Sequence, residues 1–550
     1  MEKKVSKKKV VATKKTAGRK QAEAKKRVIV TERISDKGVA LLQAAPNLEV
    51  DVKFDIPREE LLKIIPKYDA VVIRSVTKIN EEFYEHATNL KVVGRAGNGV
   101  DNIQMEGATK RGVIVVNTPE SNIVSAAEHT IGLMLASARN TVRAHKMIES
   151  RVWERKDLKG SELFHKTLGI IGLGRIGALV TKRLQAFEMK VIAYDPYISD
   201  NRFKMLGVEK CEKLEDLLKK ADIITIHTPK TPETINILTA KEFAKCKKGV
   251  RLVNCARGGL FNEQDMAAYI KKGVIASVGL DVLVDEPKPI SPLIDLPQCV
   301  LTPHLGADTK EAQDNVGIAI AQEVIDALNG KMVPNAVNLP SIHPLELEGM
   351  MGYLDLGEKL GKLYYQLEKA PVDKVEIIYQ GAAAQQETKM ITRNILKGIF
   401  APVLQERINV VNAELVAASR GTEVVESKVA GEEKGNKITV NIHSKERVYT
   451  VAGTVVNDKP RITYIDGYEF DLAPSAYMLC VKNQDKPGAI GKIGTVLGKA
   501  EVNIATMQVS RTHKDGVAMM FLAVDNPVSE GTMKKIIALE CIDNANYVEL

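Results

Sequence analysis

The sequence lacks the features that mark membrane proteins, disulfide-stabilised secreted proteins and zinc proteins. No run of about 18 uncharged apolar residues occurs in its 550 residues, so we expect no segment to span a membrane. Its six cysteines lie far apart and include no C-x-x-C pair, which predicts free thiols and neither a disulfide framework nor a metal site. Free thiols fit a reducing compartment, and we therefore expect a cytoplasmic protein.

The chain has almost no net charge once its first residues are set aside. The formal net charge is +9, but residues 1–27 alone carry +10 and the remainder −1. Residues 1–26 are Lys-rich without apolar periodicity, which predicts a disordered extension. We favour a solubilising tail over a nucleic-acid, membrane-surface or targeting role, because it lacks the apolar stretch of a secretory signal and is a poor match to Arg- and Ser-rich transit peptides. We expect neither nucleic acid nor a membrane as partner.

Length and composition predict several globular domains. A chain of 550 residues is too long for one hydrophobic core, since cores stop growing near ~250–300 residues. Its 45% apolar and 27% charged residues are typical of a protein that can bury such cores.

Short apolar runs alternate with helical stretches through the first 308 residues, which predicts two doubly wound parallel sheets. We expect residues 127–308 to form a Rossmann nucleotide domain, inserted into a flavodoxin-like domain made of 27–126 and 309–337. The first sheet should use runs at 28–32, 48–54, 70–75, 90–97 and 112–119, and the second six strands at 167–177, 190–196, 222–229, 250–259, 275–283 and 299–306.

The pattern changes after residue 338, where we expect two α+β domains. In 338–475, Leu356, Leu360, Leu363 and Leu367 form one stripe of an amphipathic helix. A second helix near 388–405 and strands at 437–443, 446–456 and 461–465 should follow. Residues 476–550 show β-α-β-β-α with a weak final strand, which is typical of a ferredoxin-like domain.

Gly172, Gly174 and Gly177 form a G-x-G-x-x-G motif that follows an apolar run and opens a helix. Glycines let the backbone approach a pyrophosphate, and the helix N-terminus supplies free N–H groups. Asp195, at the end of the next strand, can accept hydrogen bonds from a ribose and would repel a 2′-phosphate. The motif therefore predicts an NAD site, although a ligand-free strand-to-helix turn is the alternative.

Three further polar residues follow predicted strands of the second sheet. Arg257, Glu286 and His304 come after the runs VRLVN, IASVGLDVL and VLTP. The carboxyl ends of parallel strands meet at one edge, so these side chains should converge. Oxidation of a 2-hydroxy acid needs a base, a cation for the carboxylate and an acid that orients the base, and these three residues supply those types. Taken singly, each could be a solvated loop residue.

The segments GLGRIG, NCARGG, DVLVDEP and TPHLGA, in this order and spacing, resemble the D-isomer-specific 2-hydroxyacid dehydrogenase family. The resemblance implies that Arg257 holds the substrate carboxylate, that Glu286 raises the basicity of His304, and that His304 is the acid/base. Asp308 stands where the family pattern has Ser or Thr. The resemblance also implies a cofactor site formed by Gly172, Gly174, Arg175, Ile176, Gly177, Asp195, His227, Thr228, Pro229, Ala256, Asp281 and Gly306, with Ala256 and Asp281 at the nicotinamide.

The segments RSVTKI (74–79) and GRAGNGVDNI (94–103) are similar to the phosphoglycerate branch of this family. The similarity implies that Arg74 and Arg95 bind the substrate phosphate, which guanidinium groups suit because they bind it bidentately. It also implies that Asn98, Gly99 and Val100 form the loop around the substrate, and that Arg139 reaches a site across a dimer interface. Trp153 could lie at a subunit contact or equally in a core.

The C-terminal part resembles the regulatory part of the long members of that branch. Residues 338–475 are similar to their intervening domain, and DKPGAIGKIGTVLGKAEVNI (485–504) resembles an ACT domain, an amino-acid-sensing module. The resemblance implies that Asp485 and Asn503 bind L-serine between paired subunits of a homotetramer or dimer. Asn483 replaces a tyrosine that is common in one branch, and a purely structural ACT pairing is the alternative.

The function implied is NAD-dependent oxidation of 3-phospho-D-glycerate to 3-phosphooxypyruvate, the first step of L-serine biosynthesis, with L-serine as effector. Two alternatives stay open: a hydroxypyruvate or glyoxylate reductase, and an NAD-sensing, corepressor-like binding module that keeps the dehydrogenase fold without catalysis.

Overall fold

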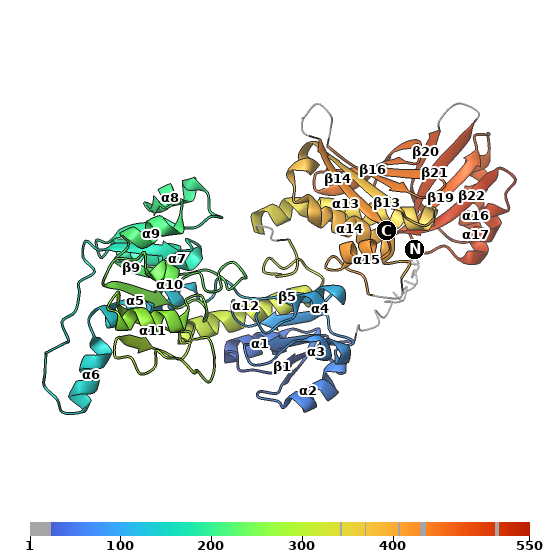
Figure 1. Cartoon of the computed structure of the whole chain (residues 1–550). Coiled ribbons are helices and arrows are strands. Elements are labelled where there is room, and N and C mark those ends of the chain that lie inside the picture. Colours follow the sequence, from blue (N-terminus) through green and yellow to red (C-terminus); the bar gives the residue numbers. More distant parts are fainter. Residues whose placement is uncertain (1–23, 341–343, 369, 405–406, 430–435, 512–515) are drawn as a thin grey trace, which may run out of the picture.

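The structure, a computed structural model, describes residues 24–550 except 341–343, 369, 405–406, 430–435 and 512–515. The described residues form four sheets (Figure 1). Two lie within residues 26–301, the part whose sequence resembles the dehydrogenase family, and two lie in the C-terminal part, within residues 374–549. Most of the basic tail predicted for residues 1–26 lies outside the described residues.

The first sheet is entirely parallel, with the order β2-β1-β3-β4-β5 that is typical of flavodoxin-like folds. Its strands have short, fully apolar centres; Ala70 to Ile73 are completely buried. The elements are β1 Lys26–Val30, α1 Asp36–Ala44, β2 Leu48–Val52, α2 Arg58–Ile64, η1 Ile65–Lys67, β3 Ala70–Ile73, α3 Glu81–His86, β4 Val92–Arg95, α4 Met105–Lys110 and β5 Ile114–Val116.

The chain returns to this sheet through α12 (Lys310–Leu328), as Figure 1 shows. Ile320 and Val324 of α12 lie in one core with Val72 of β3. Gly317 meets Gly38 of α1 where the two helices cross; a Cβ on either would collide with the other helix's backbone or a neighbouring serine. The domain boundaries themselves, 27–126 with 309–337 and 127–308, stay predictions.

The second sheet has seven strands in the order β12-β11-β10-β9-β6-β7-β8, all parallel, which is a Rossmann arrangement. The prediction of six strands was wrong by one: β8 has two charged residues at the sheet edge and no apolar run that reveals it. The elements are α5 Ile123–Ala138, α6 Thr141–Glu149, β6 Thr167–Ile171, α7 Arg175–Gln185, β7 Lys190–Tyr194, α8 Asp200–Leu206, β8 Glu209–Lys210, α9 Leu214–Lys220, β9 Ile223–Ile226, α10 Ala240–Phe243, β10 Val250–Asn254, α11 Glu263–Lys271, β11 Ile275–Leu280 and β12 Cys299–Leu301.

The third sheet is mixed, with β13 and β14 parallel and its other strand pairs antiparallel. Leu356, Leu360 and Leu363 are completely buried, which confirms the predicted stripe. Strands β13, β14 and β18 were not predicted. The elements are α13 Pro344–Leu367, β13 Lys374–Gln380, η2 Gly381–Gln385, α14 Thr388–Phe400, α15 Ala413–Ser419, β14 Glu423–Val429, β15 Lys437–His443, β16 Val448–Val456, β17 Lys459–Ile465 and β18 Tyr468–Leu472.

The fourth sheet, in the order β20-β21-β19-β22, is antiparallel and carries two helices, so the ferredoxin-like prediction is confirmed. The final strand, predicted to be weak, has eight residues and pairs along its length with β19. The elements are β19 Tyr477–Gln484, α16 Ala489–Lys499, β20 Ile504–Arg511, β21 Val517–Val524, α17 Glu530–Ile537 and β22 Ile542–Glu549.

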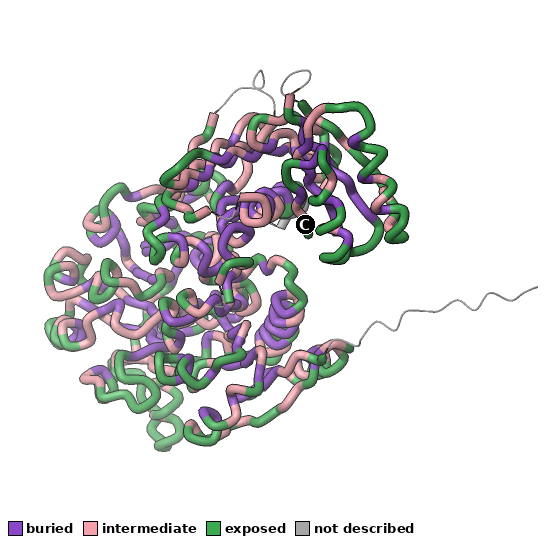
Figure 2. Tube along the Cα trace, turned by 90° about the vertical axis from the view of Figure 1, so that its right-hand side faces the viewer, coloured by how far each residue is buried: buried purple, intermediate pink, exposed green. Residues whose placement is uncertain are grey.

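The two C-terminal sheets share a hydrophobic core. Cys480 and Phe521 of the fourth sheet pack in one cluster with Leu356 and Tyr449, while the other face of that sheet packs on α16 and α17. Figure 2 shows the buried residues, in purple, mainly inside the molecule and the exposed ones, in green, mainly along its outer segments. Among the described residues no helix has the length and apolarity that a membrane crossing requires.

Candidate active site

The candidate catalytic residues lie at the carboxyl ends of parallel strands in both dehydrogenase-like sheets. Arg257 follows β10, Asp281 follows β11 and His304 follows β12. Arg95 ends β4 of the first sheet, and the loop after it faces this group. Ligands of open α/β sheets bind at such edges, because the loops that carry polar side chains converge there.

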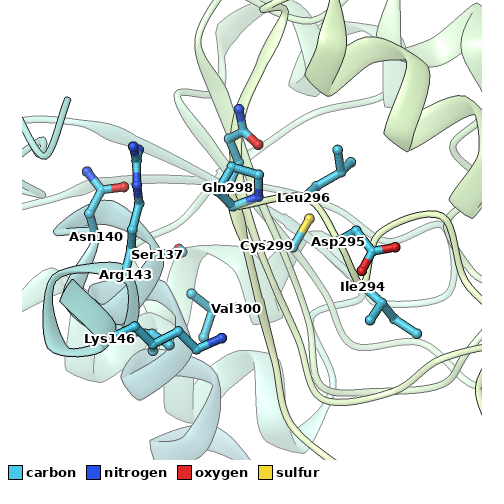
Figure 3. Close-up of a pocket in the computed structure, with 12 residues that line it drawn as sticks. Ser137, Asn140, Arg143, Lys146, Ile294, Asp295, Leu296, Gln298, Cys299 and Val300 are labelled. Carbon is cyan, nitrogen blue, oxygen red and sulfur yellow. The ribbon is translucent and has the colours of Figure 1, made fainter. Parts of the chain in front are cut away.

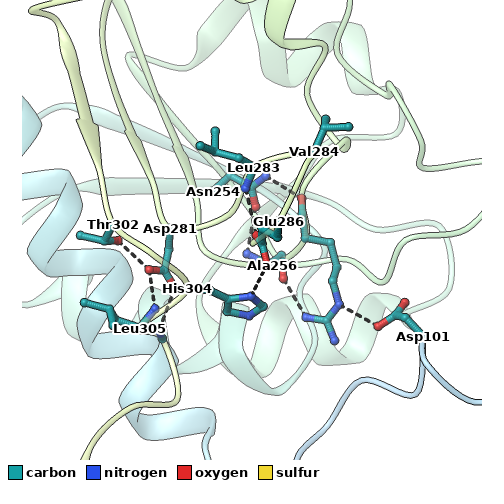
Figure 4. Close-up of polar contacts among 12 residues, drawn as sticks. Asp101, Asn254, Ala256, Asp281, Leu283, Val284, Glu286, Thr302, His304 and Leu305 are labelled. Carbon is teal, nitrogen blue, oxygen red and sulfur yellow. Dashed lines mark hydrogen bonds and ion pairs between the residues drawn. The ribbon is translucent and has the colours of Figure 1, made fainter. Parts of the chain in front are cut away.

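His304 and Glu286 form a hydrogen-bonded pair (Figure 4). His304 Nδ1 lies 2.8 Å from Glu286 Oε2, while Glu286 Oε1 accepts the backbone N–H of Leu283 at 3.0 Å. Burial opposes the charged form of Glu286, but the hydrogen bond and charge of His304 outweigh it, so the pKa of this carboxyl lies below its usual value. With Nδ1 engaged, Nε2 is the ring nitrogen left for another partner.

The backbone of His304 is left-handed, with φ +57°, a conformation that costs energy for a residue with a side chain. Asp281 holds it there. The Asp281 carbonyl accepts the N–H of His304 at 2.8 Å, and its carboxylate accepts those of Leu305 and Gly306 at 2.7 Å each. Asp281 is 1% exposed and also accepts the hydroxyl of Thr302, so the surrounding structure fixes the histidine position.

Arg257 joins the two dehydrogenase-like domains through Asp101. Its Nε lies 3.4 Å from Asp101 Oδ2, and its Nη1 donates to the carbonyl of Ala256 at 2.7 Å (Figure 4). A Cβ on Gly99 would overlap the Arg257 guanidinium, so a side chain at this position would require that guanidinium to move. The side chain of Asn254 fixes the backbone of residues 256–257, because it donates to the Arg257 carbonyl and accepts from the Ala256 N–H.

A cluster of arginines surrounds the loop after β4. Burial, together with the charges of Arg257 and Arg74, lowers the pKa of Arg95 to about 10, so Arg95 stays protonated at neutral pH. Its Nε is buried and lacks a hydrogen-bond partner among the described residues. Arg74 donates weakly, at 3.4 Å, to the carbonyl of Arg33. Three guanidinium groups that repel one another favour a polyanionic ligand.

The substrate loop predicted at Asn98, Gly99 and Val100 is held by the end of β5. Asn117 Nδ2 donates to the Asn98 carbonyl at 2.7 Å, and Thr118 Oγ1 accepts the N–H of Gly97 at 2.9 Å. Asn98 is exposed, whereas Val100 is half-buried against the first core. The loop therefore has a fixed base.

The glycine motif has the geometry that a dinucleotide requires. Gly172 has φ +89°, and a Cβ on it would crowd His227 and Thr228; nothing lies within 4 Å of the Cβ position of Gly174. Gly177 packs against the Gly172 carbonyl, which brings α7 close to the sheet. Thr228 Oγ1 is buried without a partner among the described residues, which fits a hydroxyl awaiting a bound ligand.

The other predicted cofactor residues flank this motif. Asp195 Oδ2 accepts the N–H of Leu173 at 2.9 Å. Burial lowers the pKa of His227 to about 4, so this ring is neutral at pH 7. Arg175 pairs with Glu120 at 3.2 Å, and Ile176 packs on the core under the motif. Pro229 accepts the Thr234 hydroxyl, and Gly306 accepts that of Ser125.

The structure does not bring Arg139 to this group. Arg139 caps the end of α5, ten residues beyond His129, which contacts Asp281; at 1.5 Å per residue that is about 15 Å along the helix. A shallow pocket of about 190 Å³ lies near that end, between α6 and residues 294–300 (Figure 3). Trp153 is 83% exposed, so the core alternative for it is wrong.

The predicted effector residues already have partners within the chain. Asp485 Oδ2 pairs with Arg511 at 3.0 Å, and Asn503 Nδ2 donates to Asp525 at 2.8 Å. Asn483 is 3% exposed, and its side-chain oxygen lacks a partner among the described residues. Asp308, the departure from the family pattern, lies 3.4 Å from the side-chain amide of Gln313.

Three further residues at the site were not predicted from the sequence. Asp101 lies in the segment GNGVDN, and its acidic side chain next to the substrate loop was the available signal. Asn254 ends a buried strand, where a polar residue at 2% exposure points to a structural hydrogen-bonding role. His129 Nε2, 3.1 Å from Asp281 Oδ1, carries no local signal. Among the described residues no cluster of His, Cys, Asp or Glu is arranged to hold a metal ion.

Comparisons with known families agree with this geometry. Residues 131–306 match the model of the D-isomer specific 2-hydroxyacid dehydrogenase, NAD binding domain. Residues 349–466 match the D-3-phosphoglycerate dehydrogenase intervening domain, and residues 477–541 match the ACT domain. NAD is therefore the cofactor that the matched domain binds.

Relatives match over almost the whole chain. A D-3-phosphoglycerate dehydrogenase of Archaeoglobus fulgidus is 43% identical over 95% of this chain and 100% of its own length, and one of Methanocaldococcus jannaschii is 40% identical over 95% and 100%. The crystal structure of the TT0316 protein from Thermus thermophilus is 33% identical, covers 56% of this chain and 99% of its own, and superposes with a TM-score of 0.53. The chain thus belongs to the D-3-phosphoglycerate dehydrogenases of the D-isomer specific 2-hydroxyacid dehydrogenase family.

Proposed function

We propose that this protein oxidises 3-phospho-D-glycerate to 3-phosphooxypyruvate with NAD, as the first step of L-serine biosynthesis. The observation that carries the proposal is the His304–Glu286 pair, 2.8 Å apart, beside Arg257 and the cationic cluster. The printed names of the full-length relatives support the same substrate.

In this proposal His304 is the base. Its Nδ1 is held by Glu286, so Nε2 takes the proton of the substrate hydroxyl. Glu286 stays ionised at neutral pH, because its pKa is lowered, and it stabilises the positive charge that develops on the ring. A positioned base contributes about 10²–10⁴-fold to the rate.

Arg257 binds the substrate carboxylate, and Arg74 and Arg95 bind the phosphate. A phosphate monoester with a second pKa near 6 and a carboxylate together carry roughly −3 at neutral pH, and the three guanidinium groups supply positive charge and N–H donors to both anionic groups. Arg95, Arg74 and Arg257 repel one another electrostatically, and a bound anion reduces that repulsion. The cluster therefore favours a substrate that carries a phosphate.

The cofactor residues supply the second half of the site. Gly172, Gly174 and Gly177 give the pyrophosphate access to the N-terminus of α7, with Arg175 and Ile176 opening that helix, and Asp195 accepts from the ribose. The chemistry that NAD would supply at these residues is that of a hydride acceptor for C2 of the substrate. His227, Thr228 and Pro229 would hold its adenine side, and Ala256, Asp281 and Gly306 would hold its nicotinamide side.

A substrate panel followed by NADH absorbance tests the proposal. Phosphoglycerate should be turned over far better than lactate, glycerate or 2-hydroxyglutarate, and His304→Ala should lose most turnover while still binding NADH. A hydroxypyruvate or glyoxylate reductase would prefer the unphosphorylated acids. A corepressor-like module would bind NADH without turnover, and full activity of His304→Ala would exclude the proposed base.

We further propose that L-serine inhibits the enzyme at Asp485 and Asn503, between ACT domains of paired subunits in a cytoplasmic homotetramer or dimer. Inhibitor binding would have to displace the Arg511 and Asp525 partners seen within one chain. In such an assembly Arg139 reaches a neighbouring subunit's site. Serine titration with Asp485→Ala as comparison tests this, and activity unchanged up to millimolar serine would refute it.

A further inference from the structure

A buried acid contacts the segment that carries Arg74. Glu32 follows β1 at the carboxyl edge of the first sheet and is 8% exposed. Its carboxylate accepts the backbone N–H of Thr77 at 2.8 Å through Oε1 and that of Val76 at 3.1 Å through Oε2. Glu32 has no part in the mechanism above, yet it is one of the few buried acids in this sheet's domain.

The segment that Glu32 binds begins with Arg74. Asn102 also holds this segment: its Nδ2 donates to the carbonyls of Arg74 at 2.9 Å and Thr77 at 2.7 Å. The hydroxyls of Thr31 and Thr77 meet at 3.2 Å. Residues 74–77 form neither helix nor strand, so these side chains replace the backbone pairing that would otherwise fix the loop.

The electrostatics of Glu32 fit a carboxylate that works through hydrogen bonds. Burial opposes its charged form, but the backbone N–H groups of Thr77, Val76 and Arg74 outweigh burial, so its pKa lies below the usual value. Its charge also acts on Arg95, whose pKa burial and the other arginines lower. Glu32 therefore remains an anion at neutral pH, and its charge acts to raise the pKa of Arg95.

We propose that Glu32 is a positioning residue for the phosphate subsite: by fixing residues 74–77 it aims Arg74 at the substrate phosphate and sets the preference for a phosphorylated acid. This inference rests on the proposed function, since it assigns the arginine cluster to the phosphate. It makes no claim on the His304 chemistry, which lies on the other domain.

Two simpler roles for Glu32 predict different results. If Glu32 were only a counter-charge, its neutralisation would make the subsite more positive, and the KM for a phosphorylated substrate would fall. If it were only a packing residue, phosphorylated and unphosphorylated substrates would lose kcat/KM equally. A positioning role predicts a selective rise in the KM of the phosphorylated substrate alone.

The experiment uses the full-length protein in the reduction direction with NADH, comparing 3-phosphooxypyruvate with hydroxypyruvate. Glu32→Gln keeps the shape, but only one of its two heads can accept an N–H, so one loop contact is lost. We expect the KM for 3-phosphooxypyruvate to rise about tenfold, which is the effect of weakening one charge-assisted contact. The kcat/KM for hydroxypyruvate and the NADH affinity should stay within about twofold.

Asp69→Asn is the matched control. Asp69 accepts the N–H of Arg27 at 2.8 Å and pairs with Lys91 at 2.8 Å, and it lies directly before β3, at the amino ends of the same strands. We expect Asp69→Asn to change the KM for 3-phosphooxypyruvate and the KM for hydroxypyruvate by the same factor. If Glu32→Gln does not fold, Glu32→Asp, which keeps the charge but shortens the reach, should show the same selective rise.

An unchanged or improved KM for 3-phosphooxypyruvate, or an equal loss for both substrates, would overturn the inference about Glu32. A wild-type enzyme that prefers hydroxypyruvate would instead overturn the proposed function, so the two failures are distinct.

Discussion

Replacing Glu286 by glutamine tests the catalytic pair most directly. The carboxylate uses both oxygens: Oε1 accepts the N–H of Leu283 at 3.0 Å, and Oε2 meets His304 Nδ1 at 2.8 Å. A glutamine of the same shape has one accepting and one donating head. If its oxygen keeps Leu283, its amide N–H points at Nδ1 and selects the tautomer whose proton sits on Nε2. That tautomer cannot accept the substrate proton.

The expected loss has two parts. A hydrogen bond to a charged group contributes about 1.5–3 kcal/mol, and because the two side chains are 37% and 48% exposed we take the lower end, about tenfold in rate. The His304 tautomer with its proton on Nε2 lowers kcat further, because it cannot accept the substrate proton. The total loss of kcat cannot exceed the contribution of a general base, about 10²–10⁴-fold. We expect kcat for Glu286→Gln to fall at least about 100-fold.

The assay is kcat for 3-phosphoglycerate oxidation, with the NADH dissociation constant from fluorescence. Glu263→Gln is the control, because Glu263 Oε1 accepts the N–H of Val284 at 2.8 Å in the same segment without touching His304. We expect it to keep most activity. The reasoning would be refuted if Glu286→Gln kept half of the wild-type kcat. It would also be refuted if kcat fell as far in Glu263→Gln as in Glu286→Gln.

Three further predictions follow from the cofactor side of the site. Burial lowers the pKa of His227 from a usual 6.5 to about 4, so the unfolded chain binds a proton that the folded chain does not, and stability is lost as the pH falls from 6.5 towards 4. His227→Gln should remove this pH dependence of the free energy of unfolding, measured by urea unfolding at each pH, which amounts to up to about 3 kcal/mol at the lower end of that window. Asp281→Asn places an amide N–H against the N–H of Gly306 or Leu305, and should lower both kcat and the melting temperature. An unchanged kcat would show that the position of His304 does not depend on the Asp281 carboxylate. Asp195→Asn keeps an acceptor for Leu173 but removes the charge that repels a 2′-phosphate, so the ratio of kcat/KM for NADP over NAD should rise about tenfold, and an unchanged ratio would mean that Asp195 does not set cofactor choice.

The sequence by itself determined the chemistry wherever a short segment carries it. The glycine motif needs only a strand, a tight turn and a helix start, all within eleven residues, so its pattern predicts its geometry. Arg257, Glu286 and His304 each follow a strand of one parallel sheet, and the shared edge of that sheet brings them together. Long apolar periodicities likewise predicted the four-sheet fold class, which is confirmed.

Only the tertiary structure decided the contacts between distant segments. Strand β8 exists because β7 offers it an edge, and its two charged residues have no pattern of their own. Asp101 meets Arg257 because two domains close on each other, and Glu32 meets Val76 because β1 and β3 are neighbours in the sheet. A buried carboxylate is stabilised by N–H groups that the fold, and not the adjacent sequence, supplies. The roles of such residues therefore cannot be predicted from the sequence around them.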